Sequence, residues 1–356
     1  MSSLIVQACK IEELYPHPNA DKLEVARIKG WFVLVGKGEH KVGDLVSFIP
    51  IDSVLPQELV DKYQLSFLKN GNRVRSLKLR GIISMGLILP LPEGNFKEGD
   101  DLKDILNIKK WEPPQTNSNY LGTRNAVSNK KKNPYFDKYT SIENIKNYNT
   151  VFNEGDEVVI TEKIHGANVR FGYLKREGRN WFQRLWIRLF GEYEYLIGSH
   201  NVQLQGLYSK RKGYYKENVY EKAFNKYDLK KKLEKDTIVY GEVFGGSIQD
   251  LTYGLTDIDL RVFDVKKEGK YLDYDELLKY CHFYNLPMVP ELYRGKFSNA
   301  ILIQHTQGNS ILCTNQMREG CVVKSIKEQS NQFIGRKILK SINPEYLIRQ
   351  KGTENK

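Results

Sequence analysis

A lysine beside a flexible turn is the first feature of this sequence that could do chemistry. Lys163 follows the apolar stretch 158–160, and Asn168 opens the next apolar run. A strand turns alternate residues to opposite faces, so Asn168 and Arg170 are expected to share one face. Gly166 is expected to allow a tight turn between the two strands. The pattern predicts a pocket that holds a primary amine and an amide; the alternative is a surface hairpin with an ordinary lysine.

Later apolar stretches each carry one or two charged or aromatic side chains. In chain order these are Glu242, Phe263, Glu319 with Lys324, and Lys337 with Lys340. A single glutamate in a strand is more often part of a structural pair than a metal ligand. The order of the whole set is therefore far more specific than any one member.

The order Lys-x-His-Gly-x-Asn, Tyr-Gly-Glu, Phe-Asp-Val, Glu-Gly-x-Val-x-Lys and a terminal lysine strand resembles the covalent nucleotidyltransferases. These include ATP-dependent RNA and DNA ligases and mRNA capping enzymes. The His-Gly variant with Asn is similar to the RNA ligase branch. The segment 341–347, Ser-Ile-Asn-Pro-Glu-Tyr-Leu, resembles a clade of RNA ligases that carries an OB module before the ligase domain. The resemblance implies an ATP-dependent RNA ligase that seals nicks between 5′-phosphate and 3′-hydroxyl ends.

The same resemblance implies that Lys163 is the nucleophile. The lysine would attack the α-phosphate of ATP and hold AMP as a phosphoramidate, which splits a difficult reaction into easier steps. The amine must be neutral, whereas an unperturbed lysine has a pKa of ~10.4. Lys324, Lys340 and a divalent ion are expected to lower that pKa and to stabilise charge on the phosphate.

Other residues are assigned around the nucleotide and its metal ion. Glu242 and Glu319 are the metal candidates, since Mg²⁺ or Mn²⁺ needs few protein carboxylates. Phe263 is expected to stack on adenine, with Val322 on the opposite side of the base. The remaining nucleotide contacts are expected from Glu162 through its backbone, and from Ile164, Asn168, Arg170, Ser199, His200, Glu242, Lys324 and Lys340.

Two motifs depart from the pattern of the resembled family. His200 stands where many relatives carry an arginine, which leaves the roles of Ser199 and His200 open. Relatives often end with Lys-x-Lys, but Lys337 and Lys340 are separated by two residues. Only Lys340 shares strand parity with the neighbouring isoleucines, so we expect Lys340 to face the pocket and Lys337 to point away. The resemblance then implies that Lys340 contacts the α-phosphate.

Short strands broken by turn signals fill residues 3–92, which is typical of a small barrel or sandwich. The stretches 17–28 and 79–90 resemble the OB-fold module of tRNA-binding domains. This resemblance implies the fold more firmly than it implies tRNA binding. His17 and Asp21 also fit ordinary turn chemistry at the start of a strand.

The expected fold class is α+β, with an N-terminal OB-fold β-barrel followed by a nucleotidyltransferase domain of antiparallel sheets flanked by helices. The expected boundaries are 1–115 for the OB module, 116–150 for a linker or loop, and 151–356 for the adenylation domain. The polar linker carries a lysine triplet, residues 130–132, that is either a solvated face or a contact to a phosphate backbone.

An aromatic stripe is predicted within residues 175–195. On a helix, Phe182, Trp186 and Phe190 fall at positions i, i+4 and i+8. Such a stripe usually packs on its own domain. Interleaved arginines could instead bind an RNA strand.

Composition limits the possible partners. The 356 residues carry a formal net charge of +12, which suits a polyanionic partner such as RNA. The four cysteines are scattered and form no C-x-x-C pair, so we expect neither a zinc site nor a disulfide framework. We expect the protein in a reducing compartment, either the cytoplasm or the nucleus. No apolar run approaches the ~18 residues of a membrane span, so we expect no membrane association. As a separate expectation, the protein is a monomer.

Three alternatives remain open. A DNA ligase or a capping guanylyltransferase would share the motifs, but both usually place the OB domain after the catalytic domain. A binding module of tRNA-binding type with an inactive enzyme attached is the third, and the intact lysines and glutamates argue against it.

Overall fold

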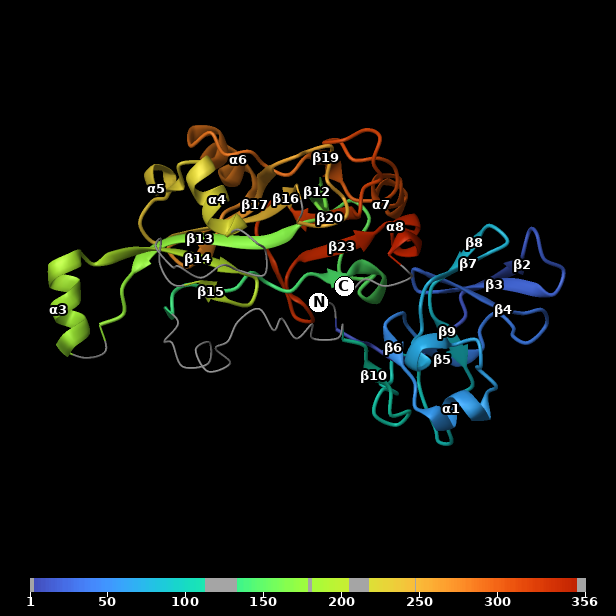
Figure 1. Cartoon of the computed structure of the whole chain (residues 1–356). Coiled ribbons are helices and arrows are strands. Elements are labelled where there is room, and N and C mark those ends of the chain that lie inside the picture. Colours follow the sequence, from blue (N-terminus) through green and yellow to red (C-terminus); the bar gives the residue numbers. More distant parts are fainter. Residues whose placement is uncertain (1–2, 113–132, 179–180, 205–217, 247, 351–356) are drawn as a thin grey trace. The chain divides into compact units, whose positions relative to one another are not determined.

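The computed structural model describes residues 3–112, 133–178, 181–204, 218–246 and 248–350 (Figure 1). The chain divides into two compact units. The first contains Met1–Thr116, Ile142–Asn153 and Leu339–Lys356, and the second contains Asn117–Ser141 and Glu154–Ile338. The first unit therefore takes two segments that the sequence boundaries assigned to the linker and to the adenylation domain.

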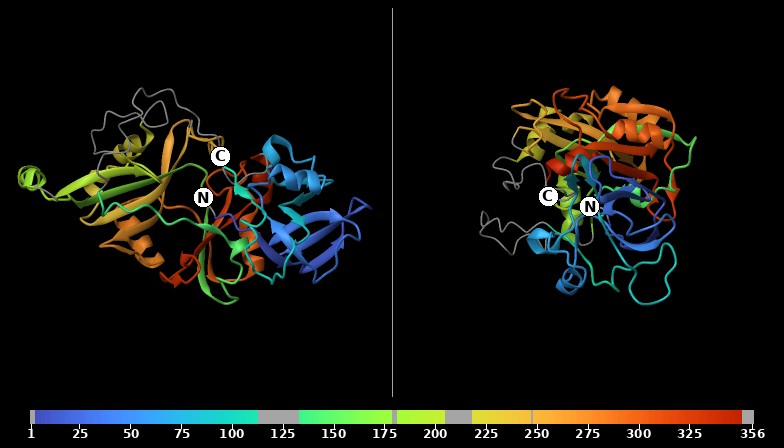
Figure 2. Two further views of the ribbon diagram at one scale, coloured as in Figure 1. Left: turned by 90° about the horizontal axis from the view of Figure 1, so that it is seen from below. Right: turned by 90° about the vertical axis from the view of Figure 1, so that its right-hand side faces the viewer.

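Short antiparallel strands form most of the first unit, as the turn-rich sequence predicts (Figure 2). One sheet has the order β1 (Gln7–Lys10), β5 (Leu45–Ile49), β9 (Leu87–Leu89), and another β2 (Glu13–Pro16), β3 (Leu23–Ile28), β4 (Trp31–Gly36). β7 (Leu77–Leu79) pairs with β8 (Ile82–Ser84), and β6 (Ser53–Val54) with β10 (Lys109–Lys110). The short helices α1 (Gln57–Lys62) and α2 (Lys69–Asn72) lie between them in the chain.

The later segments of the first unit add a parallel strand pair. β11 (Glu143–Asn144) pairs in parallel with β23 (Ile338–Ile342). The one-turn helix η1 (Ile145–Asn147) follows β11, and α8 (Pro344–Arg349) follows β23. Ser3 joins the first segment of the unit to the second, because its amide and hydroxyl both donate hydrogen bonds to the buried carboxylate of Glu143.

His17 has a structural role in this unit. Its side chain is 5% exposed, and its Nδ1 accepts a hydrogen bond from the amide of Asn19 at 3.0 Å. Nε2 must then carry the ring proton and donates it to the carbonyl of Leu79 at 3.2 Å. The imidazole therefore joins the turn before β3 to the β7–β8 hairpin.

The second unit is built on two antiparallel arrangements. The larger sheet has the order β15 (Gln203–Leu204), β14 (Tyr193–Ser199), β13 (Ala167–Lys175), β16 (Thr237–Gly245), β17 (Ile258–Lys267), β18 (Lys270–Tyr271). In the other, β12 (Glu157–Glu162) pairs with β20 (Gly320–Ser325) on one side and β19 (Glu291–Lys296) on the other. β21 (Ser330–Asn331) and β22 (Gly335–Arg336) form a short hairpin after β20.

Helices cover one face of the six-stranded sheet. α4 (Val219–Lys226), α5 (Leu229–Lys232) and α6 (Tyr274–Phe283) supply buried residues to one apolar cluster, while α7 (Asn299–Thr306) lies against β20. Val169 and Phe171 belong to that cluster and are fully buried. The predicted parity of β13 is therefore confirmed, and Asn168 and Arg170 lie on the opposite face.

The predicted aromatic stripe lies on α3 (Trp181–Phe190), but the side chains of Phe182, Trp186 and Phe190 are outside the described residues. A second stripe on the same helix is exposed to solvent and consists of Trp181, Leu185 and Leu189. The lysine triplet 130–132 also lies outside the described residues. Within the described part of the chain, no helix has the length and apolarity that crossing a membrane requires.

Candidate active site

Lys163 lies at the end of β12 and is paired with a carboxylate. Its Nζ is 2.8 Å from Oε1 of Glu319, and its amide donates to the carbonyl of Gly320 at 3.0 Å. β20 begins at Gly320 and runs antiparallel to β12, and this pairing brings Glu319 next to Lys163. The charge closest to the amine is negative, whereas the sequence led us to expect cations. An adjacent carboxylate favours the ammonium form of a lysine.

His165 joins two carboxylates beside this pair. Its Nε2 is 2.9 Å from Oδ1 of Asp250, and its Nδ1 is 3.3 Å from Oε2 of Glu319. Its amide donates to the hydroxyl oxygen of Tyr253 at 2.7 Å, which fixes the backbone after Lys163. Asp250 and Tyr253 were missed by sequence reasoning, since nothing local marks a loop residue nearly 90 positions away as a partner of the motif.

Gly166 is required by a close approach, which corrects the expected reason for this glycine. Its backbone is not in the left-handed region. A Cβ at this position would lie 2.3 Å from the carbonyl oxygen of Val243 and 3.0 Å from Cγ of Glu242. Only a residue without a side chain lets the loop after Lys163 lie directly on β16.

Glu242 faces the same loop from β16. Burial raises the pKa of Glu242 to about 8, opposed by the charge of Lys163 and reinforced by the charge of Glu319. Burial would also raise the pKa of Glu319, but the neighbouring Lys163 and His165 outweigh it and lower that pKa to about 2. The pKa values of the two carboxyl groups thus shift in opposite directions, although both groups are influenced by Lys163.

Asn168 and Arg170 present unsatisfied polar atoms on the face of the sheet that carries Glu242. Asn168 pairs in register with Glu242, and its buried Oδ1 makes no hydrogen bond with any described residue. Arg170 is 2% exposed, and within the described chain its Nε and Nη1 make no hydrogen bond. Its guanidinium lies 4.5 Å over the ring of Phe136 and close to Gly198, where a Cβ would be 2.8 Å from Nε.

Glu162 has a role that the sequence did not indicate. Its side chain is buried, and Oε2 accepts a hydrogen bond from the amide of Ile311 at 2.9 Å. Its own amide donates to the carbonyl of Pro290 at 2.8 Å. Burial raises the pKa of Glu162. Hydrogen bonds from Ser310 and from the amide of Ile311 partly offset this rise. The carboxyl thus orders the loop that leads to Glu319, and the expected contact between the backbone of Glu162 and adenine stays a prediction.

Val322 and Lys324 lie on one face of β20, as predicted. Lys324 pairs in register with Val159, a member of the apolar cluster of the six-stranded sheet, so this face is turned toward that sheet. The ammonium of Lys324 is 8% exposed and lies 3.6 Å from Oδ1 of Asp264. Val322 is half-buried, and Ile164 is almost completely buried.

Phe263 occupies a β-bulge in β17. Tyr240 pairs with Asp264 and Gly241 with Val262, which leaves Phe263 without a partner on β16. Bulges redirect side chains and are frequent beside active sites. The direction of the half-buried Phe263 ring therefore does not follow the alternation of side chains between the two faces of β17.

Ser199 is the last residue of β14, and His200 follows it in the bend that leads to β15. Ser199 Oγ accepts from the amide of Val202 at 3.2 Å. Burial lowers the pKa of His200, and the charges of Lys138 and Arg170 act in the same direction.

The two C-terminal lysines have different surroundings. Lys337 Nζ is 2.7 Å from Oδ2 of Asp156, a partner within its own unit. Lys340 is half-buried on β23 and pairs in register with Asn144, in the first unit. Its predicted contact with a phosphate stays a prediction.

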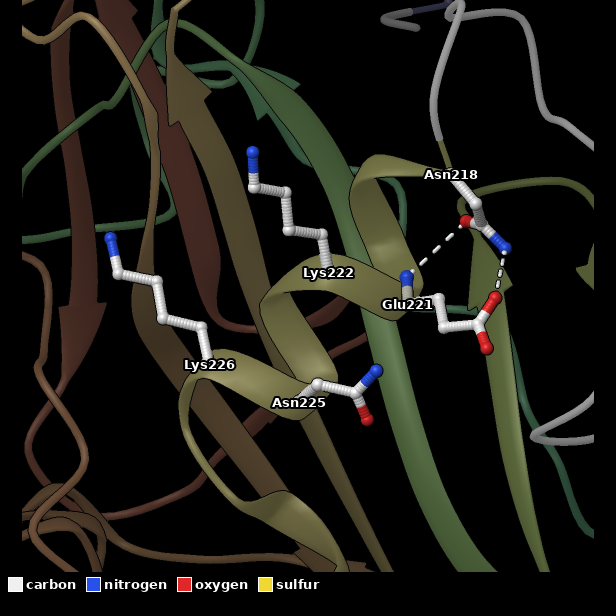
Figure 3. Close-up of a pocket in the computed structure, with 5 residues that line it drawn as sticks. All are labelled: Asn218, Glu221, Lys222, Asn225 and Lys226. Carbon is white, nitrogen blue, oxygen red and sulfur yellow. Dashed lines mark hydrogen bonds between the residues drawn. The ribbon is translucent and has the colours of Figure 1, made fainter.

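The described residues contain no group of three or more His, Cys, Asp and Glu arranged to hold a metal ion. Glu242 and Glu319 suit a cation that keeps most of its water ligands, such as Mg²⁺ or Mn²⁺. A surface depression on α4 is lined by Asn218, Glu221, Lys222, Asn225 and Lys226 (Figure 3). Lys222 is paired with Asp257 there, and none of the motif residues lines it.

The motif residues lie within one matched region. A family model described as RNA ligase matches residues 156–342, more than half of the chain. The chain belongs to the RNA ligase family. An OB-fold domain model matches residues 5–91, so the predicted N-terminal OB module of the ligase is confirmed.

Solved structures share the fold over nearly the whole ligase. The Naegleria gruberi RNA ligase with PPi matches with a TM-score of 0.73 and 24% identity, covering 99% of this chain and 100% of that chain. A mutant of the same protein with ATP and Mn matches with a TM-score of 0.71 and 23% identity, covering 99% and 100%. No curated protein sequence matches the chain. The expected α+β class, with the OB module first, is confirmed.

Proposed function

We propose that the ligase uses ATP to seal 5′-phosphate and 3′-hydroxyl ends at nicks in RNA, through AMP bound covalently to Lys163. The observation that carries this proposal is the ion pair of Lys163 with Glu319, next to Glu242, whose pKa is influenced by the charges of both residues, and Asn168, whose buried Oδ1 makes no hydrogen bond with any described residue. The Naegleria relative has been solved with ATP and Mn, and with AMP and Mn, which supports the same ligands here.

The chemistry follows from the amine. Nζ of Lys163, once neutral, attacks the α-phosphorus of ATP; the N–P bond forms and the bond to pyrophosphate breaks. An oxygen of the RNA 5′-phosphate then displaces the lysine and takes the AMP. The 3′-hydroxyl attacks the activated 5′-phosphorus, loses its proton and releases AMP.

The pocket residues would act on charge and orientation. A divalent cation held by Glu242 and Glu319 would neutralise the phosphates and compete with Lys163 for the carboxylate of Glu319. Asn168 Oδ1 and the free guanidinium nitrogens of Arg170 match the hydroxyl and phosphate groups of a nucleotide. Phe263 and Val322 would contact the base.

Intact-mass measurement after incubation with ATP and Mg²⁺ or Mn²⁺ tests the proposal. The wild type should gain the mass of one AMP, and Lys163→Ala should gain none while keeping the wild-type unfolding temperature. Lys337→Ala, a lysine already paired with Asp156, is the matched control and should gain AMP. An adduct on Lys163→Ala would place the nucleophile elsewhere.

Substrate competition separates the alternatives of the same superfamily. An adduct formed with GTP but not with ATP would indicate a capping enzyme. Faster sealing of nicked DNA than of nicked RNA, at equal concentrations, would indicate a DNA ligase.

A further inference from the structure

Residues 133–139, here called the strap, lie on the face of the six-stranded sheet that carries Asn168 and Glu242. Asn133 Nδ2 donates to the carbonyl of Lys175 at 2.8 Å. Phe136 fills the space above Gly172 and Gly198, where added Cβ atoms would lie 3.0 and 2.9 Å from its ring. The strap is therefore a packed part of the second unit, although its polar sequence resembles a linker.

Tyr139, at the end of the strap, contacts two consecutive residues of β17. Its hydroxyl donates to Oδ2 of Asp264 at 2.8 Å, and its ring meets Phe263 edge-on with the ring centroids 4.8 Å apart. Phe263 sits in the bulge without a partner on β16, so neighbouring side chains rather than the strand ladder determine its pose. Tyr139 is 5% exposed, so its ring is packed among neighbouring side chains.

The contact with Asp264 has a consequence for Lys324. Oδ2 of Asp264 accepts hydrogen bonds from the hydroxyl of Tyr139 and from Nη2 of Arg336, the latter at 2.9 Å. These two donors hold Oδ2, while Oδ1 accepts a hydrogen bond from the amide of Val265 at 3.1 Å and lies 3.6 Å from Nζ of Lys324. At that separation the pair makes no hydrogen bond, and within the described residues the ammonium keeps its N–H donors unused.

We propose that Tyr139 is a positioning residue for adenylate formation. Its ring holds Phe263 against the base, and its hydroxyl restrains Asp264 so that the donors of Lys324 remain available to a nucleotide phosphate. This inference rests on the proposed function, in which Phe263 and Lys324 contact ATP.

Two substitutions separate the two contacts. Tyr139→Phe keeps the ring and removes the hydroxyl, so Asp264 loses one of its three hydrogen-bond donors and its carboxylate can shift toward Lys324. The single-turnover rate of AMP attachment should then fall about tenfold with little change in the apparent KM for ATP. Tyr139→Leu also removes the edge contact with Phe263, so the apparent KM should rise about fivefold in addition.

A double-mutant cycle tests whether Tyr139 acts through Lys324. In a Lys324→Met background, Tyr139→Phe should not lower the rate of AMP attachment further, because the ammonium group of Lys324 is already absent. Tyr280→Phe is the matched control, because Tyr280 is also buried and donates to a carbonyl, that of Lys232, from α6. It should leave rate and KM unchanged.

The outcomes are distinguishable. A wild type that forms no AMP adduct would overturn the proposed function. A wild type that forms it, with Tyr139→Phe matching Tyr280→Phe, would overturn only the positioning role. The same conclusion would follow if Tyr139→Phe reduced the rate equally with and without Lys324, or lowered rate and unfolding temperature together.

Discussion

Nζ of Lys163 forms an ion pair with Oε1 of Glu319 at 2.8 Å. In the proposed mechanism, this pair would hold Lys163 as an ammonium ion, which cannot attack phosphorus. A cation that draws Glu319 away would both release the amine and assemble the site. Under the proposed function, Glu319 would therefore link metal binding to the protonation state of Lys163.

Glu319→Gln should uncouple these two effects. The single-turnover rate of AMP attachment should fall by roughly a hundredfold, because one preorganised charge is lost. The residual rate should reach half its maximum at a lower pH than in the wild type, because the lysine no longer faces a carboxylate. Rates measured from pH 6 to 10 check this, with Glu221→Gln on α4 as control. A half-maximal pH above that of the wild type would contradict the pairing.

Glu242 predicts how the stability of the metal-free protein depends on pH. Its pKa of about 8 is raised above the ordinary value of 4.5, so its contribution is fully present below pH 4.5 and is lost as pH rises through 8. Between these values the free energy of unfolding should fall by about 1 kcal/mol per pH unit from this group. Denaturant titrations of wild type and Glu242→Gln at pH 5.5, 6.5 and 7.5 measure the difference. Mg²⁺ should restore stability at high pH only in the wild type, and equal slopes in both proteins would refute the assignment.

Arg170 predicts a conflict between stability and function. A buried guanidinium with unused donors is costly, so Arg170→Met should raise the free energy of unfolding by about 2 kcal/mol while slowing AMP attachment. Arg73 is the contrast, because its equally buried guanidinium is paired with Asp52. Arg73→Met should lower stability by about 3 kcal/mol, because it leaves Asp52 uncompensated. Thermal and denaturant unfolding decide; a destabilised Arg170→Met would show that the arginine is satisfied.

Lys340→Ala and Lys337→Ala test the strand parity taken from the sequence. The family resemblance predicts that Lys340→Ala slows AMP attachment by roughly a hundredfold and shifts its half-maximal pH upward. Lys337→Ala removes the ion pair with Asp156 and should cost at most about 1 kcal/mol of stability, with little effect on rate. A larger rate defect for Lys337→Ala would show that the parity is wrong.

Period-two patterns were enough to predict the faces of β13, because alternation depends only on neighbouring residues. Val169 is buried, and Asn168 lies opposite it. The role of Gly166 was not accessible in this way, since the close approach of Val243 is a tertiary contact. For the same reason, the sequence could not show that Glu162 orders the loop at Ile311.

Composition misdirected the interpretation of the strap. The many asparagines and lysines in residues 116–150 favoured a linker. This average composition gave no weight to Phe136 and Tyr139, both of which are buried. Two aromatic residues three positions apart in a polar segment were the available signal. Their partners on β13, β14 and β17 are contributed by distant parts of the chain, so no local pattern could identify them.

The pairing of β11 with β23 also fixes the order in which the ligase can fold during synthesis. Residues 1–116 leave the ribosome first, yet their unit is completed only by Leu339–Lys356. Roughly 220 residues separate these segments, a delay of roughly 10 to 45 s at ordinary translation rates. During that time Glu143 has no strand beside it on which to pair. The unit that holds β1 is therefore started early and completed only once β23 has been made.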